Sequence, residues 1–144
     1  MSLKDGSKKM SKSELSDLSR INLTDDKDSI INKVKKAKTD TLPLPSSIDE
    51  LNERLEAKNL LGIYSSLNDL PIEKTINEFS GKNFSDFKNT LSEVLTSKLE
   101  PVSKEINRLL KEKNYLDEIL LDGYKKANEI ASKKLRKIHE IVGF

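Results

Sequence analysis

Two lysines three residues apart, near the start of the chain, are the side chains best suited to chemistry. Lys9 and Lys12 lie within the stretch Lys8-Lys9-Met10-Ser11-Lys12-Ser13, which follows Asp5-Gly6-Ser7. On a flexible loop, their ammonium groups can meet different oxygens of a polyphosphate, while hydroxyl and backbone N–H groups add further donors. Such a loop would stabilise the negative charge that develops on a leaving pyrophosphate. A solvated Lys/Ser loop without a ligand is the competing interpretation.

The residue counts exclude several other kinds of site. The chain has no Cys, which excludes disulfides, zinc–thiolate sites, iron–sulfur clusters and thiol catalysis. His139 is the only histidine, so a site with several histidine ligands cannot form, and we expect a surface or partly packed side chain there. No Walker phosphate-binding motif is present. The sequence therefore predicts no metal site.

The composition favours a helical chain without a generally basic surface. The 144 residues are enough for about one domain. Charged residues make up 35% of the chain, but 26 basic and 24 acidic side chains leave a net charge of only +2. Four Phe, three Tyr and no Trp leave the core to aliphatic side chains, which helices use readily. No apolar run long enough to span a membrane and no export signal is visible, so no membrane partner is predicted.

The first part of the chain predicts a polar loop and, later, a linker. Residues 1–24 are rich in Ser, Lys, Asp and Gly, which indicates a loop, with the end of a strand expected at Met1-Ser2-Leu3. Residues 41–46 contain Pro43 and Pro45, and each proline disfavours the helical conformation of the residue before it. We therefore expect residues 41–46 to separate two helical segments.

Between this loop and this linker, residues 25–40 predict a short basic helix. Asp25 or Asp26 can cap its N-terminus. The apolar side chains share one face at helical spacing, and the lysines point elsewhere. The apolar face consists of Ile30, Ile31, Val34 and Ala37, and the lysines are Lys33, Lys35, Lys36 and Lys38.

The pattern is helical from residue 47 onward. Ser47 and Glu50 form a capping box. Pro71 begins a further helix, which Gly81 ends. Pro101 must kink or split the long helix that follows, because proline lacks an N–H and crowds the preceding turn. The expected helices cover residues 47–70, 71–81, 83–113 and 115–141.

The last of these helices carries both an apolar stripe and a group of basic side chains. Tyr124 lies on the apolar stripe, so we expect it in the core. The basic side chains could contact nucleic-acid phosphates. Because helical spacing spreads them over more than one side, a solvated surface is an equally good interpretation. They are Lys125, Lys126, Lys133, Lys134, Arg136 and Lys137.

The pentapeptide KMSKS at residues 9–13 is the second active-site motif of class I aminoacyl-tRNA synthetases. The residues around and after it resemble bacterial-type tryptophanyl-tRNA synthetases, above all the alphaproteobacterial and mitochondrial branch. Glu14 stands where this family commonly has Asp, which keeps the charge. The resemblance covers essentially the whole chain, in the stretches 1–13, 19–26, 36–40, 59–64, 84–91, 122–123 and 141–144.

This resemblance implies an enzyme that activates tryptophan with ATP to tryptophanyl-adenylate and then transfers it to tRNA-Trp. Lys9 and Lys12 would be the catalytic residues that contact the ATP phosphates, and Met10, Ser11 and Ser13 would shape the loop. Mg²⁺ would accompany ATP, although the sequence shows no carboxylate ligand set for it. The resemblance also implies a homodimer as the full-length enzyme, in the bacterial cytoplasm or the mitochondrial matrix.

The implied fold is mainly α: the C-terminal helical bundle of a class I synthetase, with the KMSKS loop at its N-terminus. Family members carry a Rossmann half with a HIGH-type motif and the tryptophan pocket upstream of KMSKS. We therefore expect Met1 to be an internal methionine of a longer enzyme and this chain alone to be inactive. The implied segments are the end of the catalytic domain at 1–24, a connecting basic helix at 25–40, a linker at 41–46 and a helical tRNA/anticodon-region domain at 47–144.

A chain without the Rossmann half would expose apolar surface. We expect the apolar faces of residues 25–38 and of the last helix to lack a packing partner. Two other functions stay open at this stage: a stand-alone helical module that binds tRNA without catalysis, and a helical interaction bundle in which the pentapeptide is accidental. A tyrosine-type synthetase also uses a motif of this kind, but the residues after the motif favour tryptophan.

Overall fold

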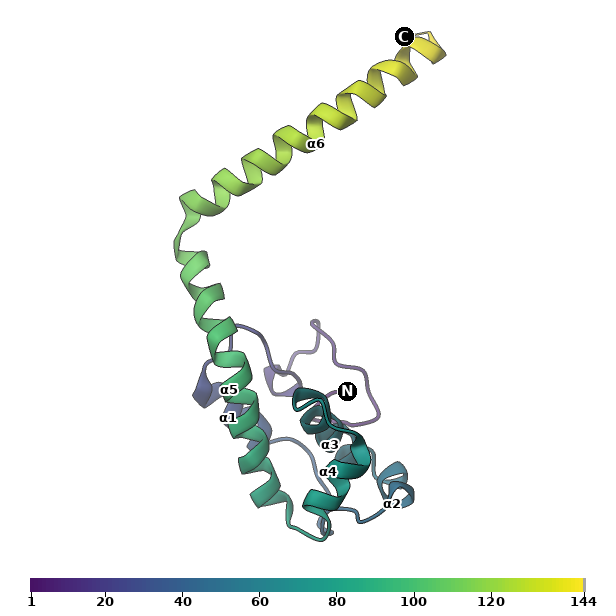
Figure 1. Ribbon diagram of the computed structural model, residues 1–144, viewed down its shortest axis with the longest axis vertical. Helices are drawn as coiled ribbons and strands as arrows, with labels where there is room; N and C mark the ends of the chain where they lie inside the picture. Colours follow the sequence, from purple (N-terminus) through teal and green to yellow (C-terminus); the bar gives the residue numbers. More distant parts are fainter. Residues whose placement is uncertain (144) are drawn as a thin grey trace. The chain divides into compact units, whose positions relative to one another are not determined.

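The computed structural model describes residues 1–143, and every regular element in this range is a helix (Figure 1). The mainly α fold is thus confirmed. The chain divides into two compact units, Met1–Lys104 and Glu105–Phe144. Phe144, the last residue of the stretch 141–144 compared above, lies outside the described residues. The elements are the 3-10 helix η1 (Asp17–Ser19) and the helices α1 (Lys27–Lys35), α2 (Ile48–Glu53), α3 (Leu55–Leu67), α4 (Ile72–Phe79), α5 (Phe84–Lys111) and α6 (Lys113–Val142).

Three aromatic side chains from α3, α4 and α5 form the centre of the first unit. The rings of Tyr64 and Phe79 meet edge to face with centroids 4.9 Å apart, and those of Phe79 and Phe87 do so at 4.8 Å. Edge-to-face pairs are favourable because the positive edge of one ring meets the negative face of the other. Phe87 and Leu91 are fully buried. Aliphatic residues complete this core, as the composition predicts.

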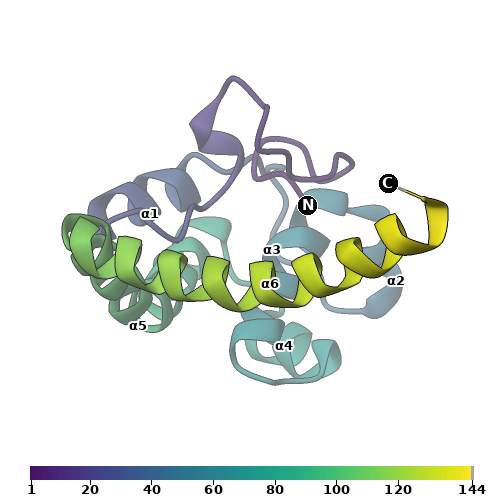
Figure 2. The same ribbon diagram turned by 90° about the horizontal axis from the view of Figure 1, so that it is seen from above.

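The apolar face of α1 belongs to the same core. Ile30 and Val34 are fully buried, and Ala37 is 4% exposed. α1 lies beside α5 in both views (Figures 1 and 2), and the Lys88 ammonium of α5 donates to the Ala37 carbonyl at 2.6 Å. The expectation that the apolar face of residues 25–38 lacks a packing partner is therefore wrong, because helices of this chain already cover it. Asp26 caps α1 by accepting a hydrogen bond from the Ser29 N–H at 2.8 Å.

The first predicted helix after the linker is in fact two helices. The helix breaks at Arg54, whose backbone lies outside the helical region at φ −120° and ψ 84°. Ser47 caps α2 as predicted, since its Oγ accepts from the Glu50 N–H at 3.2 Å. The Glu50 carboxylate, however, accepts from the Ser46 N–H at 2.8 Å and not from Ser47. The second hydrogen bond of the capping box therefore comes from Ser46, one residue before the expected Ser47.

Two further expectations need correction. Met1–Leu3 do not form a strand among the described residues. They lie outside regular structure, and Ser2 and Leu3 make backbone hydrogen bonds with Lys8, Ser19 and Lys38. Of the two effects expected of Pro101, a kink or a split, the split does not occur, because α5 is continuous from Phe84 to Lys111. A proline removes only one N–H donor, and the neighbouring turns keep their own hydrogen bonds.

The second unit consists of the end of α5 and the single helix α6, and it has no buried residue in α6. Tyr124 is 63% exposed, so its predicted core position is wrong. The apolar side chains of α6 are exposed, as expected for the last helix; Ile130, for example, is 68% exposed. A Cβ at Gly123 would meet no atom within 4 Å. None of the helices within residues 1–143 is both long and apolar enough to cross a membrane.

We predict that two aromatic truncations differ strongly in cost. Phe87→Ala removes a fully buried ring and lowers the free energy of unfolding by about 3–5 kcal/mol. Tyr124→Ala, on the exposed surface of α6, changes it by no more than about 0.5 kcal/mol. Urea denaturation followed by circular dichroism measures both. A Tyr124→Ala variant as unstable as Phe87→Ala would contradict the exposed position of Tyr124.

Candidate functional site

The KMSKS loop, here residues 4–18, is closed at its base by backbone hydrogen bonds. The Leu3 N–H donates to the Ser19 carbonyl at 2.9 Å, which joins the two ends of the loop. The Lys38 N–H donates to the Leu3 carbonyl at 2.8 Å, so this base is tied to the segment after α1. Leu3 and Ser19 are each only 2% exposed. The loop therefore projects from a base that is part of the packed core.

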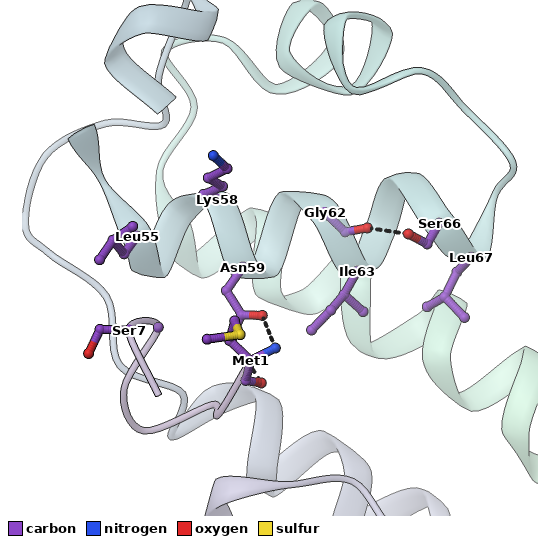
Figure 3. Close-up of a pocket in the computed structure, with 10 residues that line it drawn as sticks. Met1, Ser7, Leu55, Lys58, Asn59, Gly62, Ile63, Ser66 and Leu67 are labelled. Carbon is purple, nitrogen blue, oxygen red and sulfur yellow. Dashed lines mark hydrogen bonds between the residues drawn. The ribbon is translucent and has the colours of Figure 1, made fainter. Parts of the chain in front are cut away.

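Helix α3 supports the same base from another side. The Asn59 amide donates to the Ser2 carbonyl at 3.0 Å, and its oxygen accepts from the Met1 amino group at 3.1 Å. Figure 3 shows Asn59 reaching Met1 beside a pocket of about 710 Å³ along α3. A Cβ at Gly6 would lie 2.6 Å from the Leu55 carbonyl oxygen, so only glycine allows this close approach to the start of α3.

The tip of the loop presents the predicted phosphate-binding side chains to solvent. Lys9 and Lys12 are exposed, and Met10 is 37% exposed. The hydroxyls of Ser11 and Ser13 lie 2.9 Å apart, and the Ser13 N–H donates to Ser11 Oγ at 3.3 Å. Short side-chain to backbone bonds of this kind favour a turn over helix or strand. Ser11 and Ser13 thus shape the loop, while the two ammonium groups stay available for a ligand.

Lys9 and Ser11 also line a small cavity inside the loop, and Lys12 is not among its lining residues. This cavity has a volume of about 240 Å³. Sites for whole small molecules are larger, at about 300–1,000 Å³. The cavity inside the loop is therefore smaller than a typical site for an entire small molecule. The other lining residues are Ser2, Lys4, Asp5, Lys8, Glu14 and Ser19.

A buried lysine links the loop to α1. Lys33 is 4% exposed, and its ammonium lies 2.6 Å from both the Asp17 and the Asp25 carboxylates. Burial alone lowers the pKa of Lys33, but the hydrogen bonds to the two carboxylates outweigh it and raise that pKa. The hydrogen bonds from Lys33 and Asn22 hold the pKa of Asp17 below its ordinary range. Asp17 also pairs with Arg20 at 3.1 Å.

Sequence reasoning missed this network, because the prediction placed Lys33 away from the apolar face of α1. The signal was present. Lys33 stands three residues after Ile30 and four before Ala37, which is the spacing of the apolar stripe itself. A lysine at such a position needs close hydrogen-bond acceptors when it is buried, and the Asp17 and Asp25 carboxylates supply them here.

The six basic residues of α6 are exposed and spread over roughly half of the helix circumference at about 100° per residue. Lys126 pairs with Asp122 at 2.7 Å, and Lys133 pairs with Glu129 at 2.7 Å. A cavity of about 420 Å³ brings together three of the six with two isoleucines: Lys133, Lys134, Lys137, Ile130 and Ile138. Lys125, Lys126 and Arg136 lie outside this cavity.

The described residues offer no obvious metal centre. Across residues 1–143, no group of three or more His, Asp or Glu side chains could hold a metal ion. His139 is exposed on α6. A divalent cation at the loop would therefore need the phosphates of a ligand as its main partners.

Comparison with known proteins identifies the relatives of this chain. Residues 1–100 match the family described as tRNA synthetases class I (W and Y). The whole chain is 47% identical to a tryptophan–tRNA ligase of Brucella melitensis and 50% identical to one of Agrobacterium fabrum. A crystal structure of tryptophanyl-tRNA synthetase from Mycoplasma pneumoniae matches 100% of the chain with a TM-score of 0.69 and 25% identity. The resemblance read from the sequence is confirmed.

The chain spans less than half the length of these relatives. It covers 41% of the Brucella and Agrobacterium proteins and 45% of the Mycoplasma chain. The printed names describe those whole proteins. What such a protein does with tryptophan, ATP and tRNA is therefore carried to the present chain only as a proposal.

We predict that the pKa of Asp17 depends on Lys33. In Lys33→Met, the carboxyl of Asp17 loses its main hydrogen-bond donor, so its pKa rises toward the ordinary value of 3.8. Because the folded-state pKa is depressed, this pair stabilises the fold above pH 3.8, and the stabilisation is lost as the pH falls toward the folded-state value. Lys35→Met, an exposed neighbour on α1, should leave the titration unchanged.

Carbon-13 NMR of the Asp17 carboxyl across the acid range measures this pKa in all three proteins. Equal Asp17 titrations in the native chain and in Lys33→Met would show that the ion pair does not exist in solution.

Proposed function

Because this chain belongs to the class I tRNA synthetases of the W and Y family, we propose that it is part of a tryptophan–tRNA ligase. Such an enzyme activates tryptophan with ATP and transfers it to tRNA-Trp. The observation that carries the proposal is the KMSKS tip at residues 9–13, exposed on a loop whose base is packed in the core. Similarity over the whole chain to proteins named tryptophan–tRNA ligase favours tryptophan over tyrosine.

In this proposal, Lys9 and Lys12 are the catalytic residues, and both act electrostatically. Their ammonium groups contact the ATP phosphates and stabilise the charge that develops on pyrophosphate as tryptophan attacks the α-phosphate. Met10, Ser11 and Ser13 keep the loop in the shape that presents these two groups. Mg²⁺ accompanies ATP and is held mainly by its phosphates.

Binding of tryptophan and of the adenine ring needs residues beyond this loop. The cavity of about 240 Å³ is smaller than the roughly 300–1,000 Å³ typical of sites for whole small molecules. We therefore propose that the chain alone forms no adenylate, and that the remainder of a full-length, homodimeric enzyme supplies the tryptophan pocket. In that enzyme, residues 1–24 close the catalytic site, residues 25–40 connect, residues 41–46 act as a linker and residues 47–144 meet the tRNA. The location would be the bacterial cytoplasm or the mitochondrial matrix.

A second candidate function is a helical module that binds tRNA without catalysis. The exposed basic side chains of α6 favour it, since three of them surround one cavity. The binding surface would consist of Lys125, Lys126, Lys133, Lys134, Arg136 and Lys137. In the catalytic proposal, the same side chains contact the phosphates of tRNA-Trp, so the two functions differ only in whether the KMSKS loop acts on ATP.

We predict that Lys9→Ala and Lys12→Ala each lower the rate of tryptophan activation by about 10²–10³. The test uses a chimeric enzyme in which this chain replaces the matching 41% of the Brucella melitensis relative. Tryptophan-dependent ATP–pyrophosphate exchange is the readout, and the KM for tryptophan should not change. Lys36→Ala is the control, because Lys36 is exposed and lies outside both the KMSKS loop and the cavity within it.

Equal rates in the chimera, Lys9→Ala and Lys12→Ala would reject the catalytic role and leave the tRNA-binding module as the better account. Exchange by the 144-residue chain without any added protein would reject the claim that it is inactive alone.

We also predict that tRNA binding by the chain depends on the basic side chains of α6. Lys134→Gln with Lys137→Gln should weaken binding of tRNA-Trp and reduce the slope of log K against log salt by about one to two, since about two phosphate contacts are lost. Lys74→Gln with Lys98→Gln, which removes two exposed lysines from α4 and α5, is the control. Equal losses in both pairs would indicate non-specific charge attraction only.

A further inference from the structure

Arg20 lies outside the KMSKS motif but contacts its backbone on both sides of Lys12. Its Nη1 donates to the Ser11 carbonyl at 3.2 Å and to the Glu14 carbonyl at 3.0 Å. One guanidinium nitrogen therefore bridges the two carbonyls that flank the Lys12-Ser13 dipeptide. Arg20 therefore contacts the backbone of Ser11 and Glu14 and not the Lys12 side chain. Within residues 1–143, the Lys12 ammonium makes no ion pair, and it is exposed.

The guanidinium of Arg20 is itself held by two side chains close to it in sequence. Its Nη2 lies 3.1 Å from the Asp17 carboxylate, and its Nε donates to the Asn22 side chain at 3.2 Å. Asp17 in turn accepts from the buried Lys33 ammonium of α1 at 2.6 Å. Because the guanidinium is planar, two fixed nitrogens set the position of the third. Through Lys33 and Asp17, α1 therefore helps to set the position of Arg20 Nη1 beside the loop backbone.

The tip has few other contacts that could order it. Every residue from Ser7 to Leu15 is exposed. Apart from the bonds that Arg20 donates, the side-chain hydrogen bonds of residues 11–14 within the described chain are those between Ser11 and Ser13. Exposed polar loops with few buried contacts are mobile on fast timescales. An ammonium group that must meet one phosphate oxygen acts best when its backbone is already in place.

We propose that Arg20 is a positioning residue for Lys12. It holds the backbone of residues 11–14 in one arrangement, so that the Lys12 ammonium is placed for the ATP phosphates before ATP binds. This inference rests on the proposed function of the KMSKS loop. It assigns to Arg20 no contact with ATP.

Arg54 provides a matched control elsewhere in the same unit. Its Nη1 donates to the Pro43 carbonyl at 2.7 Å, and its guanidinium pairs with the Asp40 carboxylate. The two arginine side chains are similarly covered, at 18% exposed for Arg20 and 16% for Arg54. Arg54 orders the linker and not the KMSKS loop. Arg54→Ala therefore removes a similarly covered arginine and its hydrogen bonds, but it leaves the contacts of Arg20 with residues 11–14 in place.

The first test measures loop order in the 144-residue chain by nitrogen-15 relaxation. We expect backbone order parameters at residues 11–14 near the rigid value of about 0.85, and below about 0.6 in Arg20→Ala. Arg20→Lys should also lose order, because one ammonium nitrogen cannot occupy the three separate positions from which Nε, Nη1 and Nη2 reach Asn22, the loop carbonyls and Asp17. Arg54→Ala should leave residues 11–14 unchanged. Unchanged order at these residues in both Arg20 variants would overturn the proposal.

The second test measures coupling between Arg20 and Lys12 in the Brucella chimera. Arg20→Ala should lower kcat for pyrophosphate exchange about tenfold to a hundredfold, with the KM for tryptophan unchanged. In Arg20→Ala with Lys12→Ala, the rate should equal that of Lys12→Ala alone, because a mispositioned Lys12 and an absent one are equivalent. Multiplicative losses would overturn the proposal, since Arg20 would then act independently of Lys12.

The two proposals fail in different ways. If Lys12→Ala does not slow exchange, the proposed catalytic role of the loop fails, and with it a positioning role for Arg20 in catalysis. If Lys12→Ala slows exchange but Arg20→Ala changes neither the order of residues 11–14 nor the rate, only the role of Arg20 is overturned.

Discussion

The burial of the Lys33 ammonium between two carboxylates is the interaction on which the arrangement of the loop depends. A buried charge is stable only with close partners, so Lys33 requires Asp17 and Asp25 to lie beside α1. Asp17 brings Arg20 with it, and Arg20 reaches the KMSKS backbone. The helical core thereby extends its order to an exposed loop. The base of the loop, closed by backbone hydrogen bonds between Leu3 and Ser19, completes this support.

The sequence was sufficient to predict the helical class and a cap at Asp25 or Asp26, of which the structure shows Asp26, because these depend on local residue preferences. It did not predict the break at Arg54, whose side chain bonds to Asp40 and Pro43, more than ten residues earlier in the chain. The pattern on α6 predicted a core position for Tyr124, but periodicity shows only which side chains share a face and not whether another element covers that face.

The KMSKS tip could be recognised from five letters, whereas the residues that hold it could not. Lys9 and Lys12 belong to a motif whose spacing carries a mechanism. Arg20 and Asp17 are ordinary charged residues in sequence, and only the folded chain brings them beneath the tip. In the proposed function, the exposed ammonium groups act electrostatically above a supporting network, since such catalysis needs fixed charges in place before the reaction begins.

The central claim is that this loop serves a tryptophan–tRNA ligase, and the most direct measurement is the activity of the unmodified chimera with the Brucella melitensis relative. We expect tryptophan-dependent ATP–pyrophosphate exchange and charging of tRNA-Trp at rates close to those of that relative. A folded chimera that binds tryptophan but supports no exchange would contradict the account, because the KMSKS loop of this chain would then be unable to act on the phosphates of ATP.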